Sequence, residues 1–222
     1  MIKIVAISDT HLSHNQLEIP ECDLLIHSGD FSFVGKMVDV LDVNQWFGKL
    51  KASGKVKEIV AIAGNHDWIG QTNPSWTKEA FTNCIYLDEE PCEVFGFKVF
   101  GSAWSPEFNN WAFNAKRGKE IARHWSKIPD DTEILVTHGP PMGILDINTE
   151  EIYSKPLGPE HLGCEELRKR VKKLKELKLH VFGHIHSSNG MDTVDGVQFV
   201  NASVLNESYE VVYPPRVIHL EK

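Results

Sequence analysis

Five short polar motifs, each placed directly after an apolar run, constrain this chain more than any other feature of its sequence. In chain order they are Asp9-Thr10-His11, Gly29-Asp30, Gly64-Asn65-His66-Asp67, Thr137-His138-Gly139 and Gly183-His184-Ile185-His186. The runs before them are short and bounded by polar turns, which is typical of strands buried on both faces. Residues at the carboxyl ends of neighbouring parallel strands meet in one crevice. The sequence therefore predicts that the five motifs form one polar site.

The wider pattern predicts an α/β fold. Apolar runs predict strands at Ile2–Ile7, Asp23–His27, Glu58–Ala63, Glu93–Phe95, Lys98–Phe100, Ile134–Thr137, His180–Phe182, Gln198–Val200 and Tyr209–Val212. Apolar spacing and capping residues predict helices over Val38–Leu50, Ser75–Phe81, Lys116–Trp125 and Cys164–Leu177. Strands alternate with helices at first and dominate later, which favours a mixed α/β sandwich. Two long segments, Ser102–Ala115 and Gly139–Leu162, are expected to form the walls of a cleft.

Length and charge exclude several classes of protein. The 222 residues predict one domain over residues 1–222, and a hydrophobic content of 41% excludes a disordered chain. No apolar run approaches the roughly 18 residues that a membrane-spanning helix needs, so no membrane partner is expected. The 31 acidic and 23 basic residues give a net charge of −8. That balance disfavours long nucleic acid as a partner, because such binders carry a basic patch or stripe.

The cysteines and the first residues predict a cytoplasmic location. The run Met1–Ile7 is followed by no cleavage site of the kind that a secretory signal needs, and it is better explained as the first strand. The four cysteines form no C-x-x-C pair and are too few for a disulfide-stapled domain; they are Cys22, Cys84, Cys92 and Cys164. We interpret them as free thiols in a reducing compartment.

The order of the motifs is far more specific than any single residue in them. Any one Asp or His here is more often structural than a ligand. At about 5% usage per residue type, G-H-x-H should occur about 0.03 times by chance in such a chain, and G-N-H-D about 0.001 times. The full set, from Asp9 to His186, resembles the calcineurin-like metallophosphoesterase superfamily, whose pattern is D-x-H, G-D, G-N-H-[D/E], a lone H and G-H-x-H.

Four further stretches are similar to the metallophosphoesterase-domain-containing subfamily of small phosphodiesterases: Phe97–Trp104, Thr137–Asp146, Gly163–Leu167 and Val181–His186. The resemblance implies a four-layer αββα sandwich, in which helices flank two mixed β-sheets and the metal site lies at the carboxyl ends of the strands. It also implies two divalent cations. The first would be held by Asp9, His11 and His186, and the second by Asn65, His138 and His184, with Asp30 bridging both.

The chemistry of these side chains suits that implied site. Nitrogen and oxygen ligands without thiolate are compatible with Mn²⁺, Fe or Zn²⁺, and we favour Mn²⁺. Two ions bring a charge of +4 against −2 from Asp9 and Asp30, which leaves a cleft that attracts a phosphate ester. The implied mechanism is attack of a metal-bridging hydroxide on phosphorus. His66 is the catalytic candidate, because it would stabilise developing charge or protonate the leaving oxygen.

The expected function is hydrolysis of phosphodiester bonds in a small phosphate ester, such as a nucleotide. A protein phosphatase is disfavoured, because Gly29-Asp30 is followed by Phe31-Ser32-Phe33-Val34-Gly35, which lacks the D-R-G of that group. A phosphomonoesterase and a DNA or RNA nuclease stay as alternatives. A non-catalytic scaffold on the same fold is the least favoured, since every motif is intact.

Other side chains near the motifs receive structural assignments. His27 is expected to be a hydrogen-bonded core residue, and His14 a loop residue at the rim of the cleft. Trp104, Phe108 and Trp111 are expected to pack the long loop in preference to stacking on a nucleobase.

Overall fold

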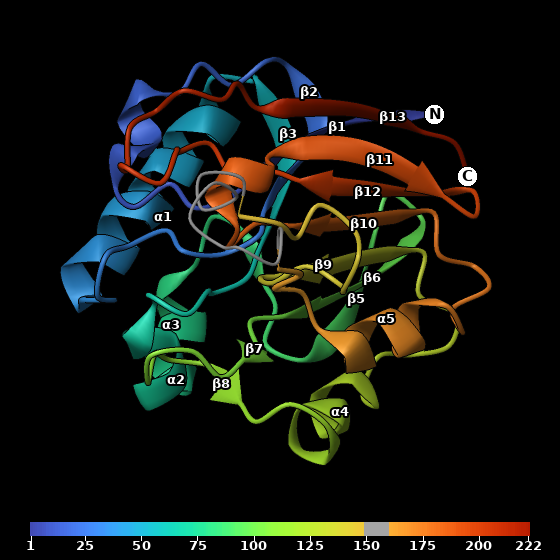
Figure 1. Cartoon of the computed structure of the whole chain (residues 1–222). Helices are drawn as coiled ribbons and strands as arrows, with labels where there is room; N and C mark the ends of the chain where they lie inside the picture. Colours follow the sequence, from blue (N-terminus) through green and yellow to red (C-terminus); the bar gives the residue numbers. More distant parts are fainter. Residues whose placement is uncertain (149–159) are drawn as a thin grey trace.

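The computed structural model describes residues 1–148 and 160–222, and it places two β-sheets face to face between two groups of helices (Figure 1). Across the first sheet the order is β13 (Arg216–Leu220), β1 (Ile2–Ile7), β2 (Cys22–His27), β3 (Val56–Ala61) and β4 (Ile85–Tyr86). The strands β1 to β4 are parallel, whereas β13 is antiparallel to β1.

The second sheet is also mixed. Its order is β11 (Gly190–Val194), β12 (Val197–Asn201), β10 (Leu179–Phe182), β9 (Ile134–Thr137), β6 (Phe97–Ser102) and β5 (Glu90–Val94). The four central strands are parallel, and the two edge strands are antiparallel to their neighbours. Two very short strands, β7 (Ser105–Pro106) and β8 (Asn114–Ala115), pair with each other outside the large sheets.

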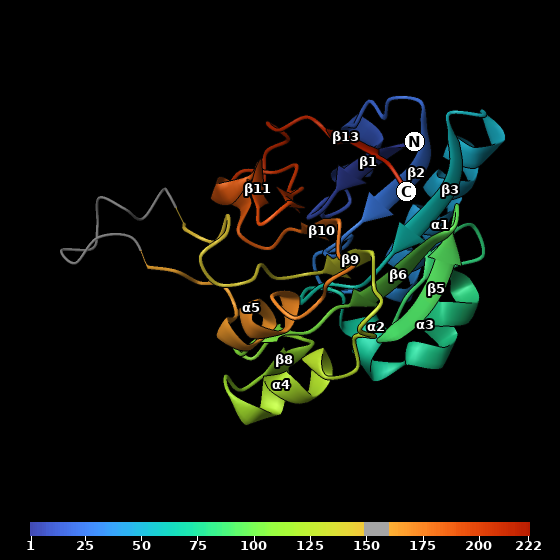
Figure 2. The same cartoon turned by 90° about the vertical axis from the view of Figure 1, so that its right-hand side faces the viewer.

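The helices cover the outer faces of the two sheets (Figure 2). Beside the first sheet lie α1 (Met37–Ala52), α2 (Trp68–Thr72), α3 (Pro74–Ala80) and the 3₁₀ turn η1 (Ser13–Gln16). The second sheet is covered by α4 (Lys119–Trp125) and α5 (Glu165–Val171), and η2 (His186–Ser188) follows β10. Within the described residues, no helix combines the length and the apolar character that crossing a bilayer requires.

Three apolar layers hold these elements together, and strand alternation explains them. Ile4 and Ala6 of β1 pack between the two sheets, while Val5 and Ile7 pack toward the helices of the first sheet. In β10, Val181 likewise faces the layer between the sheets, and Phe182 faces α4 and α5. The expected four-layer α/β sandwich, with strands buried on both faces, is confirmed.

Several strand assignments differ from the sequence expectation, and the two-residue strands β4, β7 and β8 are among those not predicted. The strands β11 and β13 are not predicted, because both are edge strands in which polar residues interrupt the apolar pattern. The predicted strand at Tyr209–Val212 is wrong. Asn206 Oδ1 accepts hydrogen bonds from the backbone N–H groups of Ser208 and Glu210, and Tyr209 has a φ of 61°, so the chain turns there.

Two helices and one histidine also differ from expectation, and one of these helices, the short α2, is not predicted. The helix predicted over Cys164–Leu177 ends at Val171, although the spacing of buried leucines continues through the turns that follow. His14 is not a rim residue, because it is fully buried in η1, 3.3 Å from Asp42 Oδ2 and packed on Trp46. His27 is a hydrogen-bonded core residue, as predicted. Residues 149–159 of the expected cleft wall Gly139–Leu162 lie outside the described residues.

Candidate metal centre

The five polar motifs follow the carboxyl ends of parallel strands from both sheets. β1 leads to Asp9 and His11, β2 to Asp30, β3 to Asn65 and His66, β9 to His138, and β10 to His184 and His186. An isolated parallel bridge between Ser8 and Ser203 joins the two sheets at this edge. The eight candidate residues therefore meet where the two sheets adjoin.

Local backbone geometry turns several of these side chains into the crevice. The backbone φ is 53° at Asp9, 38° at His11, 54° at Asp30 and 70° at His184. Residues other than glycine rarely adopt this left-handed conformation, which costs about 1–3 kcal/mol each and is concentrated at functional sites. Neighbouring loops hold the conformation, since Asp9 N–H donates to Gly29 O at 2.9 Å and His11 N–H donates to Asp30 O at 3.1 Å.

The first predicted ligand set is brought together around Asp9. One donor atom from each of Asp9, His11 and His186 lies within 4.8 Å of the other two. His186 Nε2 is 3.4 Å from Asp9 Oδ1. The buried carboxylate of Asp9 also accepts hydrogen bonds from Ser203 Oγ at 2.6 Å and from His184 N at 3.0 Å. These contacts fix the carboxylate before any ligand arrives.

The second predicted set lies beside the first, and Asp30 lies between them. Asn65 Oδ1 is 2.8 Å from His138 Nε2, and the imidazole ring of His184 is 5.0 Å from that of His138. Asp30 Oδ2 is 3.3 Å from His138 Nε2 and 3.8 Å from His11 Nε2. One carboxylate oxygen thus approaches a histidine of each set, as a bridging ligand requires.

The histidines are oriented by backbone carbonyls. In His11, His138 and His186, the Nδ1–H group donates to the carbonyl oxygens of Ser32, Ser28 and Asn206 at 2.8, 3.0 and 3.0 Å, respectively. A carbonyl oxygen only accepts, so Nδ1 carries the proton and Nε2 points into the site. Nε2 of His11 is buried and has no hydrogen-bond partner within the described part of the chain. This donor set fits divalent cations with a preference for nitrogen and oxygen ligands.

Each of the two buried carboxylates of the site contacts a histidine, and this contact shifts the pKa of both partners. Burial alone would lower the pKa of His138 and of His186, but contact with Asp30 and Asp9, respectively, raises both pKa values to about 9. Burial likewise would raise the pKa of both carboxyl groups. The charges of the surrounding histidines instead lower the pKa of each well below its ordinary value. Cations that bind here would take over the role of the two imidazolium protons and release them.

Two other groups are shifted mainly by burial. The pKa values of His11 and His184 fall to about 4, so both imidazoles are neutral at pH 7. Burial and the charge of Asp30 raise the pKa of Asp67 to about 8. Asp67 accepts hydrogen bonds from Gly64 N at 2.8 Å, from Ser32 N at 3.0 Å and from Ser32 Oγ at 2.7 Å. It therefore ties the loop after β3 to the loop after β2.

His66, the predicted catalytic residue, lies beside both ligand sets. Its Nε2 is 4.0 Å from Asp30 Oδ2, and its backbone N–H donates to Asp30 Oδ1 at 2.8 Å. Its Nδ1–H donates to Phe33 O at 2.8 Å, and its ring stacks on Trp111 at 4.1 Å between centroids. Its side chain is 13% exposed, so it is not sealed off from solvent.

Sequence reasoning missed two residues that contact the site. Ser203, which donates to Asp9, follows β12 without any motif that would mark it. Trp111 was predicted to pack the long loop with Trp104 and Phe108. Trp104 does pack within that loop, edge-on to Phe113 at 5.9 Å, and it also stacks on His124 of α4 at 3.8 Å. Trp111 instead covers the catalytic candidate. Phe108 is 59% exposed.

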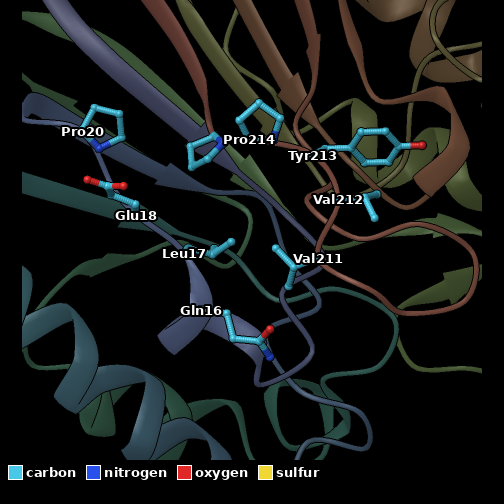
Figure 3. Close-up of a pocket in the computed structure, with 9 residues that line it drawn as sticks. Gln16, Leu17, Glu18, Pro20, Val211, Val212, Tyr213 and Pro214 are labelled. Atoms are coloured by element: carbon cyan, nitrogen blue, oxygen red, sulfur yellow. The ribbon is translucent and has the colours of Figure 1, made fainter.

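Two hollows of similar size differ in their relation to these residues. One, of about 510 Å³, adjoins the site and is lined by His184, Phe108, Arg117 and Glu207, among others. The other, of about 530 Å³, lies between the segment after η1 and residues 211–215, with Leu17 and Pro214 in its wall (Figure 3). None of the eight candidate residues lines that second hollow. Of these two hollows, only the first adjoins the candidate residues.

Comparison with known proteins identifies relatives along nearly the whole chain. The family model described as calcineurin-like phosphoesterase matches residues 2–188. The chain is 37% identical to metallophosphoesterase domain-containing protein 1 of Homo sapiens, over 98% of this chain and 71% of that protein. It is 30% identical to a UPF0046 protein of Caenorhabditis elegans, over 99% of this chain and 81% of that protein. One solved structure shares the fold, with a TM-score of 0.60, 16% identity and 90% coverage of both chains.

Proposed function

Because this chain belongs to the calcineurin-like phosphoesterase family, we propose that it hydrolyses phosphodiester bonds in a small phosphate ester with the help of two divalent cations. The observation that carries the proposal is the convergence of both ligand sets on Asp30, whose Oδ2 approaches His11 and His138 at once. Carboxylate, amide and imidazole donors in this arrangement suit Mn²⁺ in particular, and also Fe or Zn²⁺.

Each predicted residue has a role in the proposal. Asp9, His11 and His186 would hold one cation, and Asn65, His138 and His184 the other, with Asp30 shared. Bound divalent ions supply Lewis acidity and a nucleophile at neutral pH. The side chains themselves fix the donor positions through their hydrogen bonds and exclude water from the buried face of the site.

His66 is assigned to the leaving group. Its Nδ1–H is engaged by the Phe33 carbonyl, so Nε2 is the atom that would meet the departing oxygen. A proton held there would neutralise the alkoxide or phenolate as the phosphorus–oxygen bond breaks, which makes the leaving group a weaker base. The nucleophile must approach from the opposite side of phosphorus for an in-line displacement.

The charge around the site favours a small substrate over a polymer. Glu107, Glu160 and Glu207 line the adjoining hollow together with one basic residue, Arg117. Long nucleic acids bind to surfaces rich in basic side chains, and the part of this lining that the structure describes does not provide one. The segment Phe31–Gly35 lacks the aspartate and arginine of the protein phosphatases. We therefore place the substrate among small phosphodiesters, such as nucleotides.

The experiment is a substrate panel on Mn²⁺-loaded protein. Bis-p-nitrophenyl phosphate, p-nitrophenyl phosphate and cyclic nucleotides would be compared, with the His138→Ala variant and a chelated sample as controls. We expect turnover of diesters and its loss in both controls. Turnover of the monoester alone would make the protein a phosphomonoesterase. No turnover of any substrate by protein that binds two cations would support a scaffold instead.

A further inference from the structure

We propose that Trp111 is a positioning residue that sets the orientation of the His66 imidazole. The inference rests on the proposed function, in which His66 serves the leaving group. Two rings stacked at 4.1 Å between centroids, with 27° between their planes, restrict each other to a narrow range of tilts. Histidines that act as general acids are often oriented by a carboxylate. His66 instead has the aromatic face of Trp111 against its ring.

One hydrogen bond is a weak restraint on this imidazole. The Phe33 carbonyl accepts from Nδ1–H at 2.8 Å, and this contact alone opposes a turn of the ring about the Cβ–Cγ bond. Asp67 is adjacent in sequence, yet its carboxylate is occupied by donors from Ser32 and Gly64. The indole of Trp111 covers one face of the ring and opposes a turn in that direction, while the ring of His11 packs edge-on at 4.7 Å. The carbonyl and the indole together leave Nε2 directed toward the metal ligands.

The segment that carries Trp111 is fixed to the same loop as His66. Ala112 N–H donates to the backbone oxygen of Asn65, the residue before His66, at 3.1 Å. Phe113 N–H donates to Gln71 Oε1 at 2.8 Å. Trp111 therefore moves with the loop that it orients, and the stacking does not depend on a flexible surface contact.

Asn114 braces the turn on the other side of Trp111. Its Oδ1 accepts from Phe108 N at 3.0 Å, and its Nδ2 donates to Ala112 O at 3.1 Å. Asn109 and Asn110 adopt φ values of 50° and 53°, which makes the tight reversal that leads into Trp111. A loop with this many internal constraints is a suitable support for a catalytic geometry.

The kinetic test compares two diesters that differ in the basicity of the leaving group. Diphenyl phosphate releases phenolate, which needs a proton more than the p-nitrophenolate from bis-p-nitrophenyl phosphate. Small misplacements of a catalytic group cost up to about a hundredfold in rate, so we expect Trp111→Ala to lower kcat by about tenfold to a hundredfold. The loss should be greater with diphenyl phosphate, KM should be unchanged, and Trp111→Phe should recover most of the activity.

The variant Trp104→Ala is the matched control. It removes an indole of the same segment that is also stacked on a histidine, at 3.8 Å and 23°, but on His124 rather than His66. We expect it to change stability without the leaving-group dependence. In a His66→Ala background, Trp111→Ala should lower kcat no further. An equal loss in that background, or a raised KM at constant kcat, would overturn the proposal.

A spectroscopic readout separates this proposal from the proposed function. In histidine-labelled protein loaded with diamagnetic Zn²⁺, the ring signals of His66 are identified by their loss in His66→Ala. The ring nitrogen signals are the readout, because the difference between a protonated and a bare nitrogen far exceeds any ring-current effect of the indole. We expect the pattern with the proton on Nδ1 to be lost in Trp111→Ala and kept in Trp111→Phe and Trp104→Ala. If the protein hydrolyses neither diester, the function fails while the loss of that pattern still supports Trp111. Unchanged His66 signals in Trp111→Ala would refute the positioning role whatever the activity.

Discussion

The histidines of the candidate site share one kind of hydrogen bond but differ in their other contacts. His11, His138 and His186 each use Nδ1–H to contact a backbone carbonyl, which leaves Nε2 for a cation. His66 makes the same kind of contact, but it belongs to neither ligand set and has an aromatic neighbour, Trp111. In the proposed function, identical side-chain chemistry thus serves two different tasks, and the position of each histidine separates them.

His66→Ala tests that separation. General acid–base groups contribute about 10²–10⁴-fold to rate, so we expect a loss of that size in kcat with bound cations retained. The measurement pairs steady-state kinetics with metal analysis of the purified variant. Because His11, Asp30 and His66 also have donor atoms within 4.8 Å of one another, loss of a cation would instead show that His66 is a ligand.

His180, which is not one of the candidate site residues, should make the free energy of unfolding depend on pH. It is fully buried in β10, and burial lowers its pKa to about 3. The unfolded chain binds a proton near pH 6.5 and the folded protein does not, so stability is retained above that pH and lost as pH falls below it. From pH 7.5 to 5.5 this residue should cost about 1.4 kcal/mol of unfolding free energy.

Urea unfolding of the wild type and of His180→Leu at both pH values measures that cost. The Thr137 hydroxyl, which contacts His180 Nε2 at 2.8 Å, can still donate to Gly139 O in the variant. Because other titrating groups are common to both proteins, the difference in pH dependence isolates His180. Equal pH dependence in the two proteins would show that the folded protein accepts the proton.

At the scale of elements, the loops after the strands approach one another too closely for side chains at some positions. A Cβ atom at Gly183, in the loop after β10, would lie 2.1 Å from Asp9 Oδ2 in the loop after β1. No rearrangement of a flexible tip removes this clash, because the Asp9 carboxylate is held by Ser203 and by the backbone of His184. The contact between the two sheets therefore depends on glycine at this position.

Gly183→Ala should displace Asp9 and weaken cation binding by about 10–100-fold, the range found when groups that orient ligands are altered. Gly139→Ala is the matched control in the loop after β9, because its Cβ would meet Ser105 at an ordinary 3.5 Å. Calorimetric titration with Mn²⁺ compares the two variants. Equal affinity in both would mean that the loop after β10 can yield without moving the carboxylate.

The sequence predicts the elements that lie under the site better than those at the edges. Runs such as Ile134–Thr137 are apolar on both faces, so they are recognised without knowledge of their neighbours. Edge strands such as β13 alternate polar and apolar residues and acquire their identity only by pairing. The same reason explains the site: motif residues follow recognisable strands, whereas Ser203 and Trp111 reach it through tertiary contacts.

For the whole molecule, the division of the proposed ligands between two sheets would link cation binding to global stability. Asp9, Asp30 and Asn65 come from the first sheet, while His138 and His184 come from the second. A ligand that binds only the folded state stabilises it by about 2.7 kcal/mol at one hundred times its Kd. Mn²⁺ should therefore raise the melting temperature, and EDTA should reverse the effect.

Thermal unfolding with and without Mn²⁺ checks this expectation, with Mg²⁺ at equal concentration as the control for ionic strength. His138→Ala should lose most of the stabilisation by Mn²⁺. A melting temperature that Mn²⁺ leaves unchanged would contradict a site shared between the sheets.

The apolar layer between the sheets has a further consequence. Ile4, Ala6, Val136 and Val181 fill the space that separates the strands leading to the two halves of the site. The volume of these side chains therefore sets the distance between the two sheets, and with it the spacing of the donor atoms that each sheet carries. A site with this spacing constrains the interior as well as the residues that would hold the cations. Substitutions that change the volume of a buried side chain between the sheets should therefore alter the affinity for metal.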